Sequence, residues 1–270
     1  MSELIKRTIT IIFLSSLLAL LFMYGNNITF YLSIYILSIL LFFEWNSINS
    51  KNNISVVFFI ILMPIIFYLN IINILYFSLV TLLAWLVLLY CIIFIRDHTK
   101  MFIKKYFTTI GFFVCSSFFL FLMHMYPYTH TLPYNNDLSD NKLYFLFLII
   151  LISSIDIFAY ISGKAFGKNK IINNISPNKT IEGYIGGFSF TLLFFILLFN
   201  YNQITWSYLD LTYLTVFILL AFFGDLFISL VKRTYQIKDT SNILPGHGGL
   251  LDRLDSYFPS LPLFYIWIMV

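Results

Sequence analysis

Long apolar runs are the feature that most restricts what this chain can fold into. Nine of them are long enough to be membrane spans, because a helix that crosses the hydrocarbon core of a bilayer needs about 20 mostly apolar residues. The runs cover residues 8–24, 28–45, 54–70, 72–95, 106–125, 143–162, 182–200, 209–231 and 254–270. Since the alternation typical of membrane strands is absent, helices must satisfy the backbone hydrogen bonds in lipid. The sequence therefore predicts an all-α fold, a polytopic membrane helical bundle with about nine transmembrane helices.

The composition excludes most soluble classes of protein. Of the 270 residues, 60% are hydrophobic and 10% are charged, whereas an ordinary soluble domain carries about 25% charged residues. Such a chain has too few polar side chains to cover a water-facing surface, which excludes a soluble enzyme, a disordered protein and a nucleic-acid-binding domain. The first run could be a signal peptide, but it is long and eight more runs follow it, so we interpret it as an uncleaved helix.

The basic residues fall almost entirely on one side of the membrane when the nine runs are taken as spans. Fifteen of the 16 Lys and Arg residues then fall on one side of the membrane, and only Lys142 falls on the other. Cytoplasmic loops carry an excess of Lys and Arg, so we expect the N-terminus and the basic loops in the cytoplasm and the loop 126–142 outside. The short chain without extensions favours a bacterial inner membrane as the location.

The two halves of the chain differ in their polar content. Residues 1–140 hold spans one to five and the outer loop, and their polar features are sparse: Glu44 beside Trp45, and the basic loop 96–105. Residues 141–270 hold spans six to nine, and most of the polar residues that could carry chemistry lie in or between these spans. We therefore expect an N-terminal transmembrane region, 1–140, followed by a catalytic transmembrane region, 141–270.

One short segment of the second half combines an acid, glycines and lysines. Asp156 lies inside span six, where a carboxylate is costly and usually finds a partner. Near the end of this span, Gly163 and Gly167 accompany Lys164 and Lys168. Glycines let a backbone approach a ligand closely, and lysines supply point charges for phosphate. The pattern is weak by itself, since a structural hydrogen bond would explain Asp156 nearly as well.

A second segment, from Ser176 to Gly183, precedes span seven. Lys179 lies next to a helix start that Thr180 could cap, and the free N–H groups at such a start bind anions. A plain capped start, with Lys179 setting the membrane topology, explains the segment equally simply. Taken alone, we would prefer this plainer interpretation.

The densest group of charged residues lies between Gly224 and Asp255. Asp225, Ser229 and Lys232 share one face of a helix because of their spacing. Carboxylates hold divalent cations, and Mg²⁺ commonly joins one or two carboxylates to substrate phosphates, whose oxygens Lys and Arg bind. The group therefore predicts phosphoryl or nucleotidyl transfer at the membrane surface. An ion-paired loop is the alternative, but it does not require an acid inside the preceding span.

The segment SLVKRTYQIKDTSNILPGHGGLLDRLD, residues 229–255, closely resembles the signature of the phosphatidate cytidylyltransferases, also called CDP-diacylglycerol synthases. Two upstream segments are also similar to that family: DIFAYISGKAFGK and SPNKTIEG. The Glu44-Trp45 pair shows a weaker similarity to it. The resemblance implies an enzyme that condenses CTP with phosphatidic acid to give CDP-diacylglycerol and pyrophosphate. It also implies a homodimer and a Mg²⁺ centre, which a monovalent cation such as K⁺ can share.

The residue patterns and the resemblance together define a set of candidate site residues. The predicted catalytic residues are Asp225, Lys232, Arg233, Asp252 and Asp255. The predicted substrate-binding residues are Asp156, Lys164, Lys168, Ser176, Lys179, Ser229, Lys238, Asp239, His247, Gly248, Gly249 and Arg253. The resemblance implies that Asp225 and Asp252 hold Mg²⁺ and that Asp255 orients a basic partner.

Two other functions remain open. A CTP-dependent polyprenol or phytol kinase also combines basic and acidic loops in a membrane, but the complete HGGxxDRxD ending with SxxKR upstream favours the cytidylyltransferase. A proton-coupled transporter would use Asp156 and Asp225 as intramembrane carriers. Such transporters favour paired inverted repeats, and the chain shows no clear internal repeat.

Overall fold

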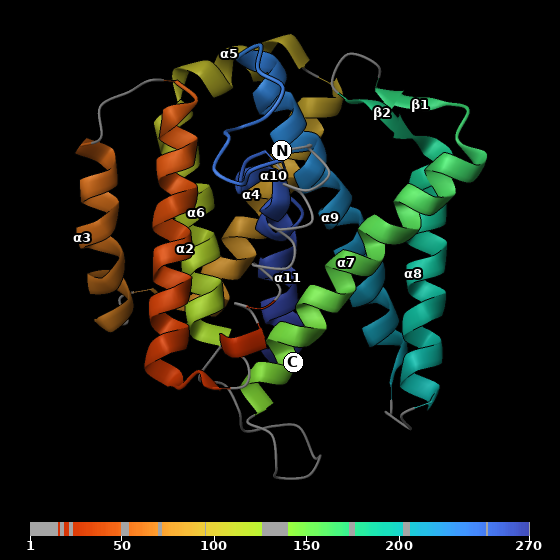
Figure 1. Ribbon diagram of the computed structural model, residues 1–270, viewed down its shortest axis with the longest axis horizontal. Helices are drawn as coiled ribbons and strands as arrows, with labels where there is room; N and C mark the ends of the chain where they lie inside the picture. The colour runs from red at the N-terminus through yellow and green to blue at the C-terminus, as the bar shows by residue number, and fades with distance from the viewer. Residues whose placement is uncertain are drawn as a thin grey trace.

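The structure, a computed structural model, is a bundle of helices (Figure 1). It describes residues 16, 19–21, 24–49, 54–69, 72–94, 96–125, 140–172, 176–201, 206–246 and 248–269. Most of the first predicted span, most of the predicted outer loop and His247 lie outside the described residues.

Seven apolar helices run between the two ends of the bundle, in alternating directions along the chain (Figure 1). They are α2 (Asn27–Ser47), α3 (Ile54–Tyr68), α4 (Ile74–Phe94), α6 (Phe107–Met125), α7 (Asp140–Phe166), α8 (Ile181–Tyr201) and α9 (Tyr208–Thr234). Six of them are long and apolar enough to cross a membrane, and α3, with 15 residues, is shorter. The prediction of an all-α membrane bundle is confirmed, whereas the count of nine spans is not confirmed within the described residues.

The helix α9 lies at the centre of the bundle. Of its apolar window, 72% is buried, compared with 22% for α4. Aromatic side chains pack the neighbouring helices onto it: the ring of Trp85 on α4 lies 5.1 Å from that of Phe227, and Trp45 on α2 stacks 6.2 Å from the same ring. Such ring pairs contribute beyond their buried area. The helix that carries the predicted catalytic acid is therefore fixed from several sides.

A small-residue contact joins α7 to α8. Ala159 and Gly163 on α7 face Gly183 and Gly187 on α8, so closely that an added Cβ on Gly187 would lie 2.8 Å from the Cβ of Ala159. Small residues four positions apart let two helix backbones approach in lipid, where dispersion replaces the hydrophobic effect. The local physical reason for these glycines is thus helix packing, rather than the approach of a ligand to the backbone.

A short antiparallel hairpin connects these two helices. Its strands are β1 (Lys170–Ile172) and β2 (Ser176–Thr180), and Lys170 pairs with Thr180. Glu182, at the start of α8, accepts hydrogen bonds from the backbone N–H groups of Lys168 and Asn169, each at 3.1 Å. These bonds close the turn after α7, so the hairpin has a fixed base.

The hairpin and one short polar helix, α5 (Arg96–Lys105), lie at the same end of the bundle as the C-terminal end of α9 (Figure 1). We call this the basic end, because it carries a group of lysines and arginines: Arg96, Lys100, Lys104, Lys105, Lys164, Lys168, Lys170, Lys179, Lys232 and Arg233. Lys142, near the start of α7, lies at the opposite end.

After α9 the chain turns back into the bundle. The loop 235–250 leads to the four-residue helix α10 (Leu251–Leu254) and then to α11 (Tyr257–Met269), which runs toward the opposite end (Figure 1). α11 falls within the last predicted run, 254–270, and its 13 residues make about 20 Å of helix.

Candidate active site

Asp252 is the best-supported carboxylate of the predicted site. Its Oδ1 accepts a hydrogen bond from Lys232 Nζ at 2.7 Å. Its Oδ2 accepts from the backbone N–H and the hydroxyl of Thr240, at 2.9 and 3.0 Å, and from the N–H of Gly249 at 3.3 Å. Burial acts to raise the pKa of this carboxyl, but the bonds from Lys232 and Thr240 outweigh it and hold that pKa below its usual value. The group is therefore a carboxylate at neutral pH.

A second carboxylate supports the same loop from the other half of the chain. Glu44 on α2 is fully buried. Its Oε2 accepts from the N–H groups of Leu250 and Leu251, at 2.8 and 3.1 Å, and its Oε1 contacts the hydroxyl of Thr240. That hydroxyl thus lies between Glu44 and Asp252, and with one hydrogen it donates to only one of them at a time.

Two local features hold Glu44 in this position. The neighbouring Trp45 donates a hydrogen bond from Nε1 to the carbonyl of Phe107 at 2.9 Å, and its ring stacks on that of Phe107 at 4.9 Å. Gly249 leaves the space that Glu44 needs, because an added Cβ there would overlap both Glu44 Oε1 and Thr240 Oγ1. Our sequence reasoning named the Glu44-Trp45 pair but assigned it no role. The signal was present: an acid near the end of a span needs a buried partner.

The hairpin brings one further charged group, Lys179, to the site. Lys179 on β2 forms an ion pair with Asp225 on α9. Burial lowers the pKa of the Lys179 ammonium, and the charges of Asp255 and Asp156 only partly offset this shift. Lys232 lies near enough to lower it further. We call the pairs Lys179–Asp225 and Lys232–Asp252 the paired-charge cluster.

Asp255 and Asp156 contribute further negative charge around this cluster. The carboxyl of Asp255 interacts electrostatically with the Lys179 ammonium. The backbone of Asp255 lies against Gly224 on α9, where any added Cβ would overlap its carbonyl oxygen. Asp156, on α7, is exposed on the surface of the bundle. The spacing argument for one face of α9 is also consistent with the structure, since Asp225 and Lys232 both reach the cluster.

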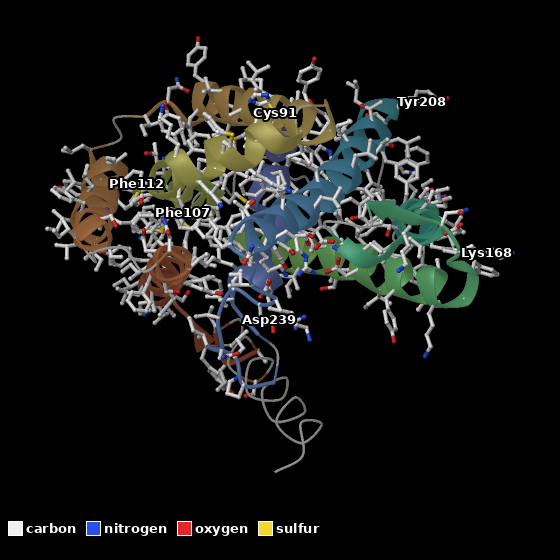
Figure 2. The ribbon with its side chains drawn as sticks, turned by 90° about the horizontal axis from the view of Figure 1, so that it is seen from above. Cys91, Phe107, Phe112, Lys168, Tyr208 and Asp239 are labelled. Atoms are coloured by element: carbon white, nitrogen blue, oxygen red, sulfur yellow. The ribbon has the colours of Figure 1, made fainter. Side chains whose placement is uncertain are left out.

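The other predicted residues lie at varying distances from this centre. Gly248 has φ of 80°, and an added Cβ there would lie 3.4 Å from Asp252 Oδ2 and 3.5 Å from Asp239 Oδ1, so both carboxylates flank it. Figure 2 shows Lys168 at the edge of the molecule, apart from Asp239. Ser176 and Ser229 are buried, whereas five charged residues are exposed: Lys164, Lys168, Arg233, Lys238 and Arg253.

The donor set suits a cation that is shared with substrate. Among the described residues, no three His, Cys, Asp or Glu side chains gather as a preformed metal cage. Asp225 and Asp252 each pair with a lysine ammonium instead. Mg²⁺ typically takes one or two carboxylates and completes its coordination with phosphate oxygens and water, so two carboxylates fit an ion that arrives with a phosphorylated substrate.

Comparison with known proteins agrees with this chemistry. The model of the cytidylyltransferase family matches residues 5–270. The chain belongs to the cytidylyltransferase family. Similar relatives include proteins named phosphatidate cytidylyltransferase. That of Bacillus subtilis (strain 168) is 42% identical over 123 residues, which are 45% of this chain and 46% of that protein. That of Staphylococcus aureus (strain COL) is 40% identical over 137 residues, 48% of this chain and 51% of that protein.

A third relative is similar to this chain over a comparable length. The phosphatidate cytidylyltransferase of Staphylococcus haemolyticus (strain JCSC1435) is 42% identical over 140 residues, 48% of this chain and 51% of that protein. The match to this member of the cytidylyltransferase family thus spans about half the length of these relatives.

Proposed function

We propose that this membrane protein transfers CMP from CTP to phosphatidic acid, giving CDP-diacylglycerol and pyrophosphate for phospholipid biosynthesis. The paired-charge cluster carries the proposal, because it places two ammonium groups and two carboxylates together inside a membrane bundle. Asp225 precedes the end of α9 by nine residues, about 13 Å along the helix, so the cluster reaches from the basic end into the bundle. This depth suits a reaction between a lipid phosphate and a water-soluble nucleotide. The names of the similar relatives support the same assignment.

The reaction needs charge neutralisation more than proton transfer. An oxygen of the phosphatidate phosphate attacks the α-phosphorus of CTP in line, and the bond from that phosphorus to pyrophosphate breaks. The attacking oxygen is already anionic, so we assign no general base. Lys179, Lys232, Arg233 and Lys164 bind the phosphates of the two substrates. Because Lys164 and Arg233 are exposed at the basic end, they suit the incoming substrate, whereas the two cluster lysines suit the reacting groups.

The resting ion pairs fit this role electrostatically. Each lysine of the cluster is neutralised by a carboxylate. When phosphates bind, the lysines can turn to the phosphate oxygens, and Asp225 and Asp252 can then hold Mg²⁺, which neutralises charge on the CTP phosphates and the leaving pyrophosphate. Asp255 orients a basic partner beside them. A monovalent cation such as K⁺ is a further candidate for the same group of carboxylates.

We further propose that the basic end faces the cytoplasm of a bacterium, in its inner membrane. The excess of Lys and Arg at that end supports this orientation, and the bacterial relatives support the membrane. The orientation gives the cluster access to CTP. We also propose a homodimer, as the family resemblance implies.

The test uses the purified protein in detergent with Mg²⁺, phosphatidic acid and CTP labelled at either the α- or the γ-phosphate. The α-label should appear in a lipid with the mass of CDP-diacylglycerol. Appearance of the γ-label in lipid would instead identify a kinase. Lys179→Gln should lose most of this activity, whereas Lys170→Gln, an exposed change in the same hairpin, should retain it. Absence of any labelled lipid would overturn the proposal.

A further inference from the structure

A pocket of about 450 Å³ lies at the basic end, outside the paired-charge cluster. It brings together the end of α2, the helix α5 and the turn after α9. Its lining contains amide, hydroxyl and ammonium groups and no carboxylate: Asn49, Lys104, Thr234, Tyr235 and Gln236. A polar pocket that offers one positive charge and several donors fits a small anion with several acceptor oxygens.

The hydroxyl of Tyr235 is the most informative group of the pocket. It is buried and has no hydrogen-bond partner within the described part of the chain. Its ring packs on that of Phe107, with 4.8 Å between the ring centres, so packing holds the side chain in place. A buried donor without a partner costs free energy, and an acceptor oxygen that reached this hydroxyl from the pocket would remove that cost.

The backbone at the pocket is unusual as well. Gln236 has φ of 59°, a left-handed conformation that few residues other than glycine adopt. This turn ends α9, and the N–H of Ile237 then bonds to the carbonyl of Lys232 at 3.0 Å. The pocket is therefore built from the residues that directly follow Lys232 and begin the loop to Thr240. A ligand in the pocket would stabilise this start of the loop.

The surface beside the pocket indicates where such an anion comes from. α5 exposes the apolar side chains of Met101 and Phe102, 69% and 48% accessible, next to Lys104 and Lys105. A helix with apolar and basic groups at the end of a membrane bundle lies in the headgroup region, where anionic lipids gather. A lipid phosphate is thus the anion nearest to this pocket.

We propose that this pocket binds the phosphate of an anionic phospholipid headgroup, with Lys104 and Tyr235 as the recognising side chains. It is a second lipid site, separate from the carboxylate-containing cluster, and its occupancy stabilises the turn that positions Lys232. The proposal does not depend on the reaction that the cluster catalyses.

The test is direct binding of phosphatidylglycerol to the full-length protein in detergent, measured by native mass spectrometry against phosphatidylcholine. Lys104→Gln removes the charge, and Tyr235→Phe removes only the hydroxyl while keeping the ring on Phe107. Each should weaken phosphatidylglycerol binding about tenfold. The control is Lys105→Gln, which removes the same charge one residue away from the pocket and should bind as the unchanged protein does. Thermal unfolding verifies that the variants are folded.

A second arm adds inorganic phosphate as competitor. Displacement of phosphatidylglycerol by millimolar phosphate, in the unchanged protein and not in the Lys104→Gln variant, would support recognition through the phosphate group. Binding of inorganic phosphate without any preference for phosphatidylglycerol would overturn the lipid assignment. Equal losses in the Lys104 and Lys105 variants, or normal binding in both Lys104→Gln and Tyr235→Phe, would overturn the site.

Discussion

The two lysine–carboxylate pairs of the cluster are held in different ways. Asp252 has four hydrogen-bond donors around it, one of which is the Thr240 hydroxyl that it shares with Glu44. The side chains of Asp252 and Lys232 are 10% and 18% exposed. Lys179 and Asp225 form one ion pair, and their side chains are 27% and 24% exposed. A group with many hydrogen bonds keeps its position when one partner is lost, whereas a partly exposed ion pair separates more easily. We therefore expect the Asp252 side to be the fixed side of the cluster and the hairpin side to be the more mobile one.

The largest expected effects come from replacing the carboxylates of Asp225 and Asp252, which should differ in how much each replacement destabilises the protein. Asp225→Asn and Asp252→Asn should both reduce turnover about 1,000-fold, because each removes a charge from the reacting centre. Only Asp252→Asn should also destabilise the fold, by about 3 kcal/mol, since it leaves Lys232 largely buried without its counter-charge. Asp225→Asn should change stability by less than about 1 kcal/mol. Turnover and chemical unfolding measure the two quantities, and equal destabilisation would contradict the comparison.

The next effect comes from Glu44, which is far from Asp252 in the sequence. Glu44→Gln should destabilise the protein by about 2 kcal/mol, because Leu250, Leu251 and Thr240 lose a charged acceptor. Turnover should fall about 100-fold as the loop loses its fixed position. Glu182→Gln is the matched control: it also removes a carboxylate that accepts backbone N–H groups, but at the base of the hairpin. A larger loss of turnover in the Glu182 variant would refute the assignment of the Asp252 side as the fixed side of the cluster.

A smaller effect distinguishes two glycines. Gly249→Ala should lower turnover about tenfold, because the new methyl group pushes Glu44 and Thr240 apart and moves the loop. Gly163→Ala should leave turnover nearly unchanged. Its added Cβ would lie 3.2 Å from Thr180 Oγ1, which can move slightly, and alanine is the better helix former. Rates per folded molecule, with thermal unfolding as the check on folding, test this pair.

The smallest effect concerns salt. In 1 M salt, the backbone amides of β1 and β2 should exchange with solvent a few times faster, because screening weakens the partly exposed Lys179–Asp225 pair. The amides of Leu250 and Leu251 should keep their exchange rates, because Glu44 holds them in a buried site. Hydrogen exchange detected by mass spectrometry measures the exchange rates of the hairpin peptide and of the peptide that contains Leu250 and Leu251. Acceleration at Leu250 and Leu251, without any at the hairpin, would reverse the assignment of fixed and movable sides.

Local hydrophobicity predicted the spans well where they are long. The run 28–45 appears as Asn27–Ser47 and the run 209–231 as Tyr208–Thr234, since a membrane helix needs only a continuous apolar segment. Within the last run, 254–270, the structure has the helix α11 and, just before it, the four-residue helix α10. Hydrophobicity did not predict the break between these two helices, because it depends on tertiary packing.

The candidate site was only partly predictable for the same reason. The segment 229–255 carries its charged residues in a continuous stretch, so Asp252 and Lys232 could be identified without a structure. The pairing of Lys179 with Asp225 could not, because it depends on the packing of α7, α8 and α9. The exposed position of Lys168, which we predicted to bind substrate, also follows only from the fold.

The sequence by itself determined that this chain is a membrane bundle, because burial of its apolar side chains in lipid is a local requirement that each run meets alone. It also supplied the carboxylates and lysines of the candidate site, whereas their burial in the fold decides how strongly each charged form is favoured. Tertiary structure alone decided which acid meets which base. Glu44 reaches Leu250 across more than 200 positions of the chain, and such a contact follows from how helices pack and from the need of a buried charge for partners.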